Sequence, residues 1–376
     1  MQTPPECFTF DAARQQFGDR VEIYQQFLQQ TDPLADAAVA TLAQLPAGKG
    51  AILLKQALND GIEAVPQAPA ALKALFAQVD HLPWWVDWQR IERGGQVLRR
   101  LSLPMLLVLG FYALPILYSS PAGTKPLAAT KYLVERAARR LAETSAFVRL
   151  NSEPGGLQRF GEGFKTSIKV RLMHAQVRRL LLRSGRWQAE AWGLPINQAH
   201  MAGTALTISA VVILKLQRLG FRFSPQEVDD VLHLWRYSHY LSGVCDDLVC
   251  TNLSDAQRFG EMVMAIEGPP DADCKALVRA LRNISPPLKG LEKQPWFSDM
   301  VGSSVRVLLG SALADALDLP KNKWRFVMPL LLALLFRVYR VQFWLPGGKG
   351  FAERLGRTAW GMTEGLFFSA AQTQKS

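Results

Sequence analysis

The chain has 376 residues, of which 49% are hydrophobic and 20% charged, and a formal net charge of +11 at pH 7. This length allows a large buried core, in one helical domain or two. The positive balance suits nucleic acid, anionic lipid or an anionic cofactor. Nucleic acid is disfavoured because the arginines are scattered among apolar helical positions and no recognised binding motif occurs.

The cysteines and the N-terminal sequence bear on metal chemistry and location. No C-x-x-C pair occurs among the four cysteines, which disfavours a thiolate zinc site, and so low a number argues against a disulfide scaffold. The N-terminal stretch MQTPPECFTFDAARQQFGD has neither the basic nor the apolar region of a secretory signal. We therefore expect a cytoplasmic protein and leave peripheral contact with a membrane open.

Helical patterns follow one another along the chain. The N-terminal part contains two short amphipathic runs, divided at Thr31-Asp32-Pro33, where a capping residue precedes proline. Lys131–Leu150 has apolar residues at helical spacing, and the glycine-rich residues 151–163 predict a loop. Ser224-Pro225-Gln226-Glu227 is a capping box, and Ser254–Gln257 repeats the pattern. Strand signals are almost absent, so we predict an all-α fold, a single irregular bundle of about a dozen helices.

Two runs, Leu103–Tyr118 and Phe326–Phe336, are strongly apolar. Both are shorter than the roughly 20 residues that cross a bilayer. Two prolines and a glycine interrupt the first run, and the second ends against Arg337 and Arg340. We expect both to be buried core helices and no segment to pass as a membrane span, with a helix that lies on a membrane surface as the alternative.

The most distinctive part of the sequence is residues 165–220, where two apolar helical segments each carry a histidine. His174 has Arg171 three residues before it and Arg178 four residues after it, so all three project to one side of a helix. His200 lies in the first turn of a run that is apolar almost all round, which is typical of a buried helix. A basic side chain at that place needs a partner, a metal or a cavity.

Motifs for common catalytic chemistries are missing. The sequence has no H-E-x-x-H, no E-x-x-H pair and no H-x-D or H-x-E, which disfavours zinc-protease, di-iron and facial iron-triad sites. Hydrolase, kinase and dehydrogenase signatures are missing too. Lone histidines on apolar helices, with cations nearby, remain. Each is explained as a satisfied core residue, or as part of a haem pocket, which needs an axial imidazole, an apolar cavity and cations for two propionates.

Three blocks, VRLMHAQVR, WGLPINQAH and RLGFRFSPQEVDDVLHLWRYSHYLSGV, follow one another. In this order they resemble the domain shared by the latex-clearing rubber oxygenases and the MpaB-type oxygenases, over about Trp85 to Pro346. The resemblance implies a globin-like helical core with a b-type haem, and oxygen-dependent cleavage of carbon–carbon double bonds in isoprenoids. C-x-x-C-H is absent, so the haem would be non-covalent. The predicted domains are an N-terminal helical extension that packs on the core (1–84), the haem-binding oxygenase domain (85–346) and a C-terminal tail (347–376).

The resemblance also implies roles for single residues. The proximal haem ligand of the family lies by the block that matches PINQAH, which indicates His200. His174 and Ala175 stand where the family has a distal lysine and threonine, so His174 is expected as a second axial ligand or a distal acid/base group. Arg171 matches the family arginine and is expected to orient the distal base or to steady developing charge. The candidates for that base are His174 and Glu143. The other residues expected around the cofactor are Arg178, Thr204 and His239, the last of which is equally explained as structural.

The predicted function is a haem-dependent oxygenase that uses dioxygen on an apolar isoprenoid or lipid-like substrate. Without an export signal, an intracellular terpenoid or fatty olefin is favoured over polymeric rubber. Two alternatives stay open. One is a non-catalytic haem or gas sensor with both His174 and His200 on the iron. The other is a haem-free lipid-binding protein at a membrane surface, which the basic charge and the apolar runs also fit.

Overall fold

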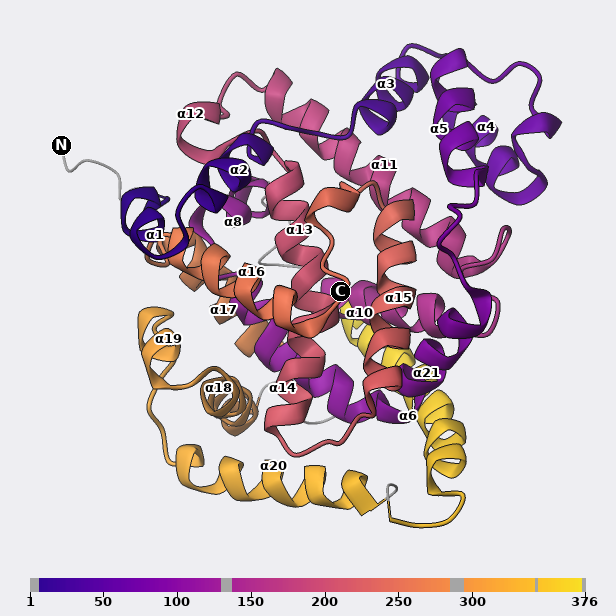
Figure 1. Ribbon diagram of the computed structural model, residues 1–376. Coiled ribbons are helices and arrows are strands. Elements are labelled where there is room, and N and C mark those ends of the chain that lie inside the picture. Colours follow the sequence, from indigo (N-terminus) through magenta and orange to yellow (C-terminus); the bar gives the residue numbers. More distant parts are fainter. Residues whose placement is uncertain (1–6, 130–136, 285–293, 342–343, 374–376) are drawn as a thin grey trace.

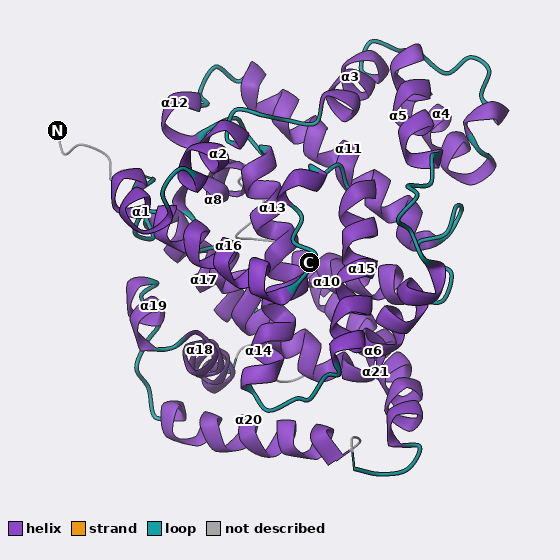
Figure 2. Ribbon diagram, viewed as in Figure 1, coloured by secondary structure: helices purple, strands orange, loops and turns teal. Residues whose placement is uncertain are grey.

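The computed structural model describes residues 7–129, 137–284, 294–341 and 344–373. Figure 2 shows that these residues form helices joined by loops, and the one extended pairing among them is an isolated bridge between Phe8 and Glu267. The all-α prediction is therefore confirmed.

The helices are joined by short connections (Figure 1). The N-terminal group comprises α1 (Phe10–Phe17), α2 (Arg20–Phe27), α3 (Pro33–Leu42), α4 (Lys49–Asp60), the 3₁₀ turn η1 (Ile62–Ala64) and α5 (Ala70–Asp80). The central group comprises α6 (Trp88–Val108), the π-helical η2 (Leu109–Ala113), α7 (Leu114–Leu117), α8 (Pro121–Ala129), α10 (Ala137–Ser152), α11 (Glu162–Arg183), α12 (Ala189–Trp192), α13 (Gln198–Leu206), the π-helical η3 (Thr207–Val211), α14 (Val212–Arg218) and α15 (Pro225–Leu241). The C-terminal group comprises the 3₁₀ turn η4 (Asp246–Leu248), α16 (Leu253–Ile266), α17 (Ala272–Arg282), α18 (Pro295–Leu309), α19 (Ser311–Ala316), α20 (Trp324–Arg340) and α21 (Gly348–Thr373).

The capping residues set several of these boundaries. Asp32 caps α3 by accepting a hydrogen bond from the Ala35 amide at 3.2 Å, and Pro33 takes the first helical position. The capping box at the start of α15 forms with both of its hydrogen bonds. The predicted start at Ser254 is off by two residues, because the side chain of Asn252 caps α16 instead.

Helix α6 lies at the centre of the bundle and packs against α10, α15 and α21. Two glycines let its neighbours approach. A Cβ atom at Gly94 would lie 2.4 Å from the carbonyl oxygen of Asp230, and one at Gly95 would lie 2.5 Å from that of Ser152. The backbone of α6 therefore lies directly against those of α15 and α10.

Two continuous helical stretches, Trp88–Leu117 and Gln198–Arg218, are long and apolar enough to cross a membrane. The expectation that no segment reaches this length was therefore wrong, since the run that begins at Leu103 continues α6. In each stretch 61% of the apolar window is buried, as in a core helix. Each contains a π-helical turn, and these turns, η2 and η3, contact each other. The prediction that Leu103–Tyr118 is a core segment is confirmed.

The second apolar run behaves differently from its prediction. In Phe326–Phe336, part of α20, only Met328, Leu332 and Phe336 are buried. The expectation of a buried core helix was wrong for the rest of this run, because α20 lies at the edge of the molecule and packs on one side (Figure 1).

Both ends of the chain contribute to the core. Buried residues of α3 and α5, such as Ala38 and Phe76, belong to the same apolar cluster as those of α6, α11 and α15. Residues 348–373, predicted as a tail, form α21, which packs on α6 and α10. Its Trp360 is fully buried and donates a hydrogen bond from Nε1 to Ser145 Oγ at 2.8 Å.

The close approach at Gly94 predicts a large loss of stability in Gly94→Ala. The added methyl group meets backbone atoms that cannot move aside, so we expect a loss of about 1–3 kcal/mol or more in urea unfolding. Gly350→Ala is the matched control, because a Cβ atom there meets nothing within 4 Å and the position is helical. A Gly94→Ala protein as stable as the parent would contradict the packing of α6 on α15.

Candidate functional site

His200 is held in place by the residue that caps its helix. The Asn197 side chain accepts a hydrogen bond from the His200 amide at 2.9 Å, and its Nδ2 donates to the carbonyl of Leu194 at 2.8 Å. The same Nδ2 lies 3.1 Å from His200 Nδ1. Because an amide nitrogen only donates, Nδ1 accepts here and the ring proton is on Nε2. His200 Nε2 is buried and has no partner among the described residues.

Three histidines of the core are uncharged at neutral pH. Burial lowers the pKa of His200 to about 4 and that of His239 to about 3. Burial, together with the charges of Arg178 and Arg140, lowers the pKa of His174 to about 4. Nδ1 of His174 and Nε2 of His239 are buried without a partner in the described structure. Neutral imidazoles with an unpartnered nitrogen are the form in which histidine binds a metal.

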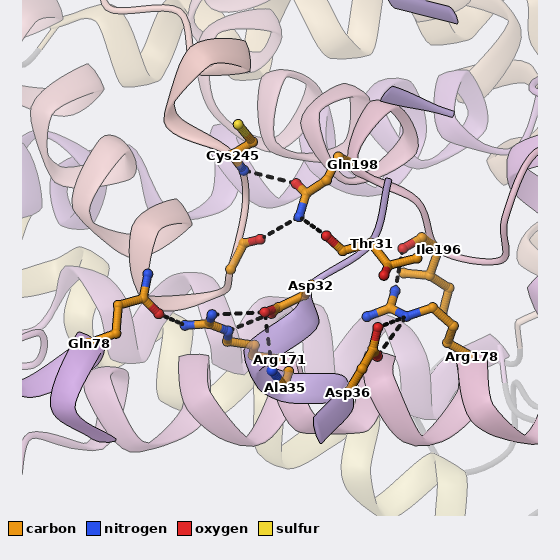
Figure 3. A network of polar contacts seen from close by, with 11 residues as sticks. Thr31, Asp32, Ala35, Asp36, Gln78, Arg171, Arg178, Ile196, Gln198 and Cys245 are labelled. Carbon is orange, nitrogen blue, oxygen red and sulfur yellow. Dashed lines mark hydrogen bonds and ion pairs between the residues drawn. The ribbon is translucent and has the colours of Figure 1, made fainter. Parts of the chain in front are cut away.

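Arg171 projects from α11 into a buried ion pair with the N-terminal helices (Figure 3). Its Nε and Nη2 donate to the two carboxylate oxygens of Asp32 at 2.5 and 2.9 Å, and Nη1 donates to Gln78 Oε1 at 2.8 Å. Asp32 is also the cap of α3. The guanidinium is thus engaged on all sides with α3 and α5, and the predicted contact with a distal base is not among its described bonds.

Arg178, two turns further along α11, joins α3 to the segment before His200 (Figure 3). Its Nε donates to both oxygens of Asp36, at 2.8 and 3.1 Å, and Nη1 donates to the carbonyl of Ile196 at 2.5 Å. Nη2 is buried without a partner among the described residues. Arg178 therefore holds the backbone just before α13 through Nη1, and its Nη2 can donate to a further acceptor.

The PINQAH block is also tied to the N-terminal segment. Gln198 Nε2 donates to the carbonyls of Thr31 and Gly243, and its Oε1 accepts from the Cys245 amide at 2.8 Å (Figure 3). The Gln198 amide donates to the carbonyl of Gln30 at 2.9 Å. The start of the helix that carries His200 is thus held by Arg178 through the Ile196 carbonyl and by Gln198 through Thr31, Gly243 and Cys245.

The face of α13 beside His200 is open. A Cβ atom at Gly203 would meet nothing within 4 Å, and Thr204 is exposed, with its Oγ1 donating to the His200 carbonyl at 2.9 Å. Gly123 of α8 flanks the ring on another side, since its Cβ would lie 3.9 Å from His200 Cδ2. Helix α8 also contacts α11, which carries His174. The two histidines thus lie on helices that share α8 as a neighbour.

The remaining predicted residues lie elsewhere. Glu143 is 52% exposed on α10 and forms an ion pair with Arg139 at 2.7 Å, so its described contacts do not link it to Arg171. His239 of α15 stacks on Trp235 and lines a cavity of about 10 Å³, about the space that one water needs. Among the described residues, no group of three or more His, Cys, Asp or Glu side chains could hold a metal ion. A metal here would depend on single histidines.

Glu267 is a half-buried residue with a buried carboxylate oxygen, and the sequence did not single it out. Burial raises its pKa to about 8, although a hydrogen bond with Ser120 opposes this shift. Phe8 pairs with Glu267 through the isolated bridge, and the Phe8 ring lies 6.4 Å from that of His200. No sequence signal marks this residue, because a glutamate just after a helix end usually faces solvent. Asn197 could have been found, since Asn three residues before His200 is a typical helix cap.

Asp32→Ala is expected to destabilise the protein by about 3–5 kcal/mol, because it leaves the charge of Arg171 buried and uncompensated. The measurement is urea unfolding of the full chain. Asp11→Ala is the matched control: it removes the exposed ion pair with Arg14, so we expect little change. Equal effects of the two substitutions would contradict the clamp between α3 and α11.

Glu267 predicts a pH dependence of stability. Its pKa is raised on folding from 4.5 to about 8, so between these values the folded chain holds a proton that the unfolded chain has lost. Its contribution is fully present below pH 4.5 and is lost as the pH rises to about 8. In Glu267→Gln the free energy of unfolding should fall less from about pH 5 to about pH 8 than in the parent. Parallel curves would show that Glu267 is ionised in the folded protein.

Comparison with known proteins identifies a family, a relative and a solved structure that this chain resembles. Residues 98–341 match the family model described as ER-bound oxygenase mpaB/B'/Rubber oxygenase, catalytic domain. A rubber oxygenase from Streptomyces sp. (strain K30) is 27% identical over 300 residues, which are 78% of this chain and 71% of that protein. The structure of latex clearing protein LCP in the closed state matches with a TM-score of 0.71 and 21% identity, over 92% of this chain and 91% of that one, and so shares the fold. Since the family model spans more than half of the sequence, the chain belongs to the family of MpaB-type and rubber oxygenase catalytic domains.

Proposed function

We propose that this protein is a b-type haem-dependent oxygenase that uses dioxygen to cleave or oxidise carbon–carbon double bonds in an apolar isoprenoid or lipid-like substrate. Membership of an oxygenase family supports the reaction class. The observation that carries the haem assignment is His200 Nε2, which is buried and unpartnered on a neutral ring at a firmly held helix start.

The surroundings of His200 fit a haem. At Gly203 and Thr204 the helix face next to His200 is not packed against another part of the described chain, so it is accessible to a cofactor. Arg178 keeps an unpartnered Nη2, and the charges of Arg178 and Arg140 reach His174, so cations are available for propionates. Binding through His200 Nε2 requires the ring proton to move to Nδ1. The Asn197 amide oxygen, which accepts from the His200 amide, would then also accept from Nδ1, and an acceptor on the second ring nitrogen orients metal-bound histidines in general.

When bound, the haem supplies the activation of dioxygen, and the residues of this chain supply ligation, orientation and proton control. His200 is the proposed proximal ligand. His174 is the proposed distal residue, and with a pKa of about 4 it is an uncharged imidazole, where the distal lysine implied by the family resemblance would be a cation. Such an imidazole can accept a hydrogen bond or bind iron, but it is a weak base. Glu143 is the less favoured base because Arg139 pairs with it at the surface.

Arg171 takes a positioning role in this proposal. Its ion pair with Asp32 holds α11, and therefore His174, against the N-terminal helices. Similarity to a rubber oxygenase supports an apolar, isoprenoid-like substrate. We propose that the substrate is a small isoprenoid or fatty olefin, to be tested before polymeric rubber. We also propose that the protein is cytoplasmic.

His200→Ala should abolish haem retention in protein purified after haem supplementation, measured as the Soret band per chain. His81→Ala is the control, because His81 is exposed and should leave the band unchanged. Asn197→Ala and Asn252→Ala each remove a helix cap and should each cost about 1 kcal/mol of stability. Only Asn197→Ala should also weaken haem binding, which separates positioning of His200 from general loss of stability.

Activity is tested by oxygen consumption with short isoprenoids, fatty olefins and polyisoprene. Full haem occupancy in His200→Ala would refute the ligand assignment. A haem protein that consumes no oxygen with any olefin, and whose spectrum loses a six-coordinate signature in His174→Ala, would favour the sensor. Absence of a Soret band in the parent would favour the haem-free lipid-binding protein.

A further inference from the structure

Helix α20 carries an apolar face that no described part of the chain covers. Figure 1 shows α20 along the lower edge of the molecule, with the rest of the chain on one side. On that side Met328, Leu332 and Phe336 are buried, and α18 and α6 are the neighbours. On the opposite side of the helix, Phe326 is 67% exposed, Leu330 73% and Leu334 61%. These three residues are four positions apart, so they form one stripe along the helix.

The stripe continues beyond the middle of α20. Val338 is also exposed, and Trp344, in the connection to α21, is 74% exposed. We call the set Phe326, Leu330, Leu331, Leu334, Val338 and Trp344 the α20 face. Large apolar side chains gathered on one exposed helix, rather than scattered singly, mark a surface that binds something. Trp344 has the amphipathic ring that is enriched where apolar and aqueous phases meet.

Basic residues flank the α20 face. The sequence from Leu319 to Ala352 contains no aspartate or glutamate, and its cations are Lys321, Lys323, Arg325, Arg337, Arg340 and Lys349. Two of them form ion pairs with acids from other helices, Lys321 with Asp315 and Lys349 with Glu227. Arg325 and Arg337 are exposed at either end of the apolar run. Exposed cations therefore lie at both ends of the apolar run of α20.

This charge pattern distinguishes between possible occupants. If two copies of α20 packed on each other in a twofold dimer, parallel or antiparallel, the positive end of one helix would meet a positive end of the other. Like charges would therefore repel across the interface. A membrane span is excluded by length, because Phe326–Phe336 measures about 16 Å at the helical rise and a bilayer core is about 30 Å thick. A surface with negative groups above a hydrocarbon layer matches both the apolar middle and the positive ends.

We propose that the α20 face binds the surface of an anionic lipid bilayer. Helix α20 lies parallel to the membrane, with Leu330 and Leu334 at the boundary between headgroups and acyl chains. The flanking arginines and lysines contact the phosphate groups. Met328, Leu332 and Phe336 keep their places against α18 and α6, so binding needs no unfolding of the bundle. The proposal is independent of haem and of the reaction.

The test is flotation of the purified full chain with vesicles of phosphatidylcholine and phosphatidylglycerol, and with vesicles of phosphatidylcholine alone. The protein should float with the anionic vesicles and bind about tenfold more weakly to the neutral ones or at high salt. The double variant Leu330→Glu/Leu334→Glu should lower binding by about tenfold or more. Arg325→Gln/Arg337→Gln should remove most of the preference for anionic lipid.

Ile52→Glu is the matched control, because Ile52 of α4 is 65% exposed and lies outside the α20 face. It should float as the parent does, and circular dichroism should show that all variants are folded. Three results would overturn the proposal. The first is a parent protein that does not float, and the second is a double variant that floats as well as the parent. The third is a dimer in analytical ultracentrifugation that the double variant dissociates, which would make α20 an interface between copies of this chain.

Discussion

The buried ion pair between Arg171 and Asp32 is the contact on which the candidate site depends. It joins the middle of α11 to the N-cap of α3, and Arg178 and Asp36 repeat the connection two turns along α11. Two charges out of water are costly unless each is fully paired, so these arginines specify how the N-terminal helices dock rather than simply adding stability. The docking in turn supplies the carbonyls of Gln30 and Thr31 that receive Gln198, and so the N-terminal residues help to place His200.

The candidate site contains a firmly held histidine and several buried polar atoms without hydrogen-bond partners among the described residues. Asn197 orients the His200 ring, while His200 Nε2, His174 Nδ1 and Arg178 Nη2 are buried without partners among the described residues. Buried polar atoms normally have partners, because an unpaired one costs about 1–3 kcal/mol. In the proposed function a bound haem would be the partner of His200 Nε2, and His174 Nδ1 and Arg178 Nη2 would face it or its substituents. The π-helical turn η3 follows directly after α13, and such turns are frequent at functional sites.

Apolar surface has two different uses in this fold. The stretches Trp88–Leu117 and Gln198–Arg218 bury most of theirs and form the interior beside the candidate site. Helix α20 has a similar composition but buries one side only. The difference arises from position, since α6 has neighbours around it, whereas α20 lies at the edge of the bundle (Figure 1).

Residue patterns were sufficient to predict the helical class, the starts of α3 and α15, and the position of His200 at a helix start, because these depend on spacing and capping within a few residues. The order of three blocks was sufficient for the family. Local patterns could not show that Arg171 and Arg178 pair with Asp32 and Asp36, more than a hundred residues away. They also could not show that Glu267 pairs with Phe8 and has a buried carboxylate oxygen. Nor could they separate α20 from a core helix. Burial and charge pairing are properties of what packs against a segment, so only the tertiary structure decided them.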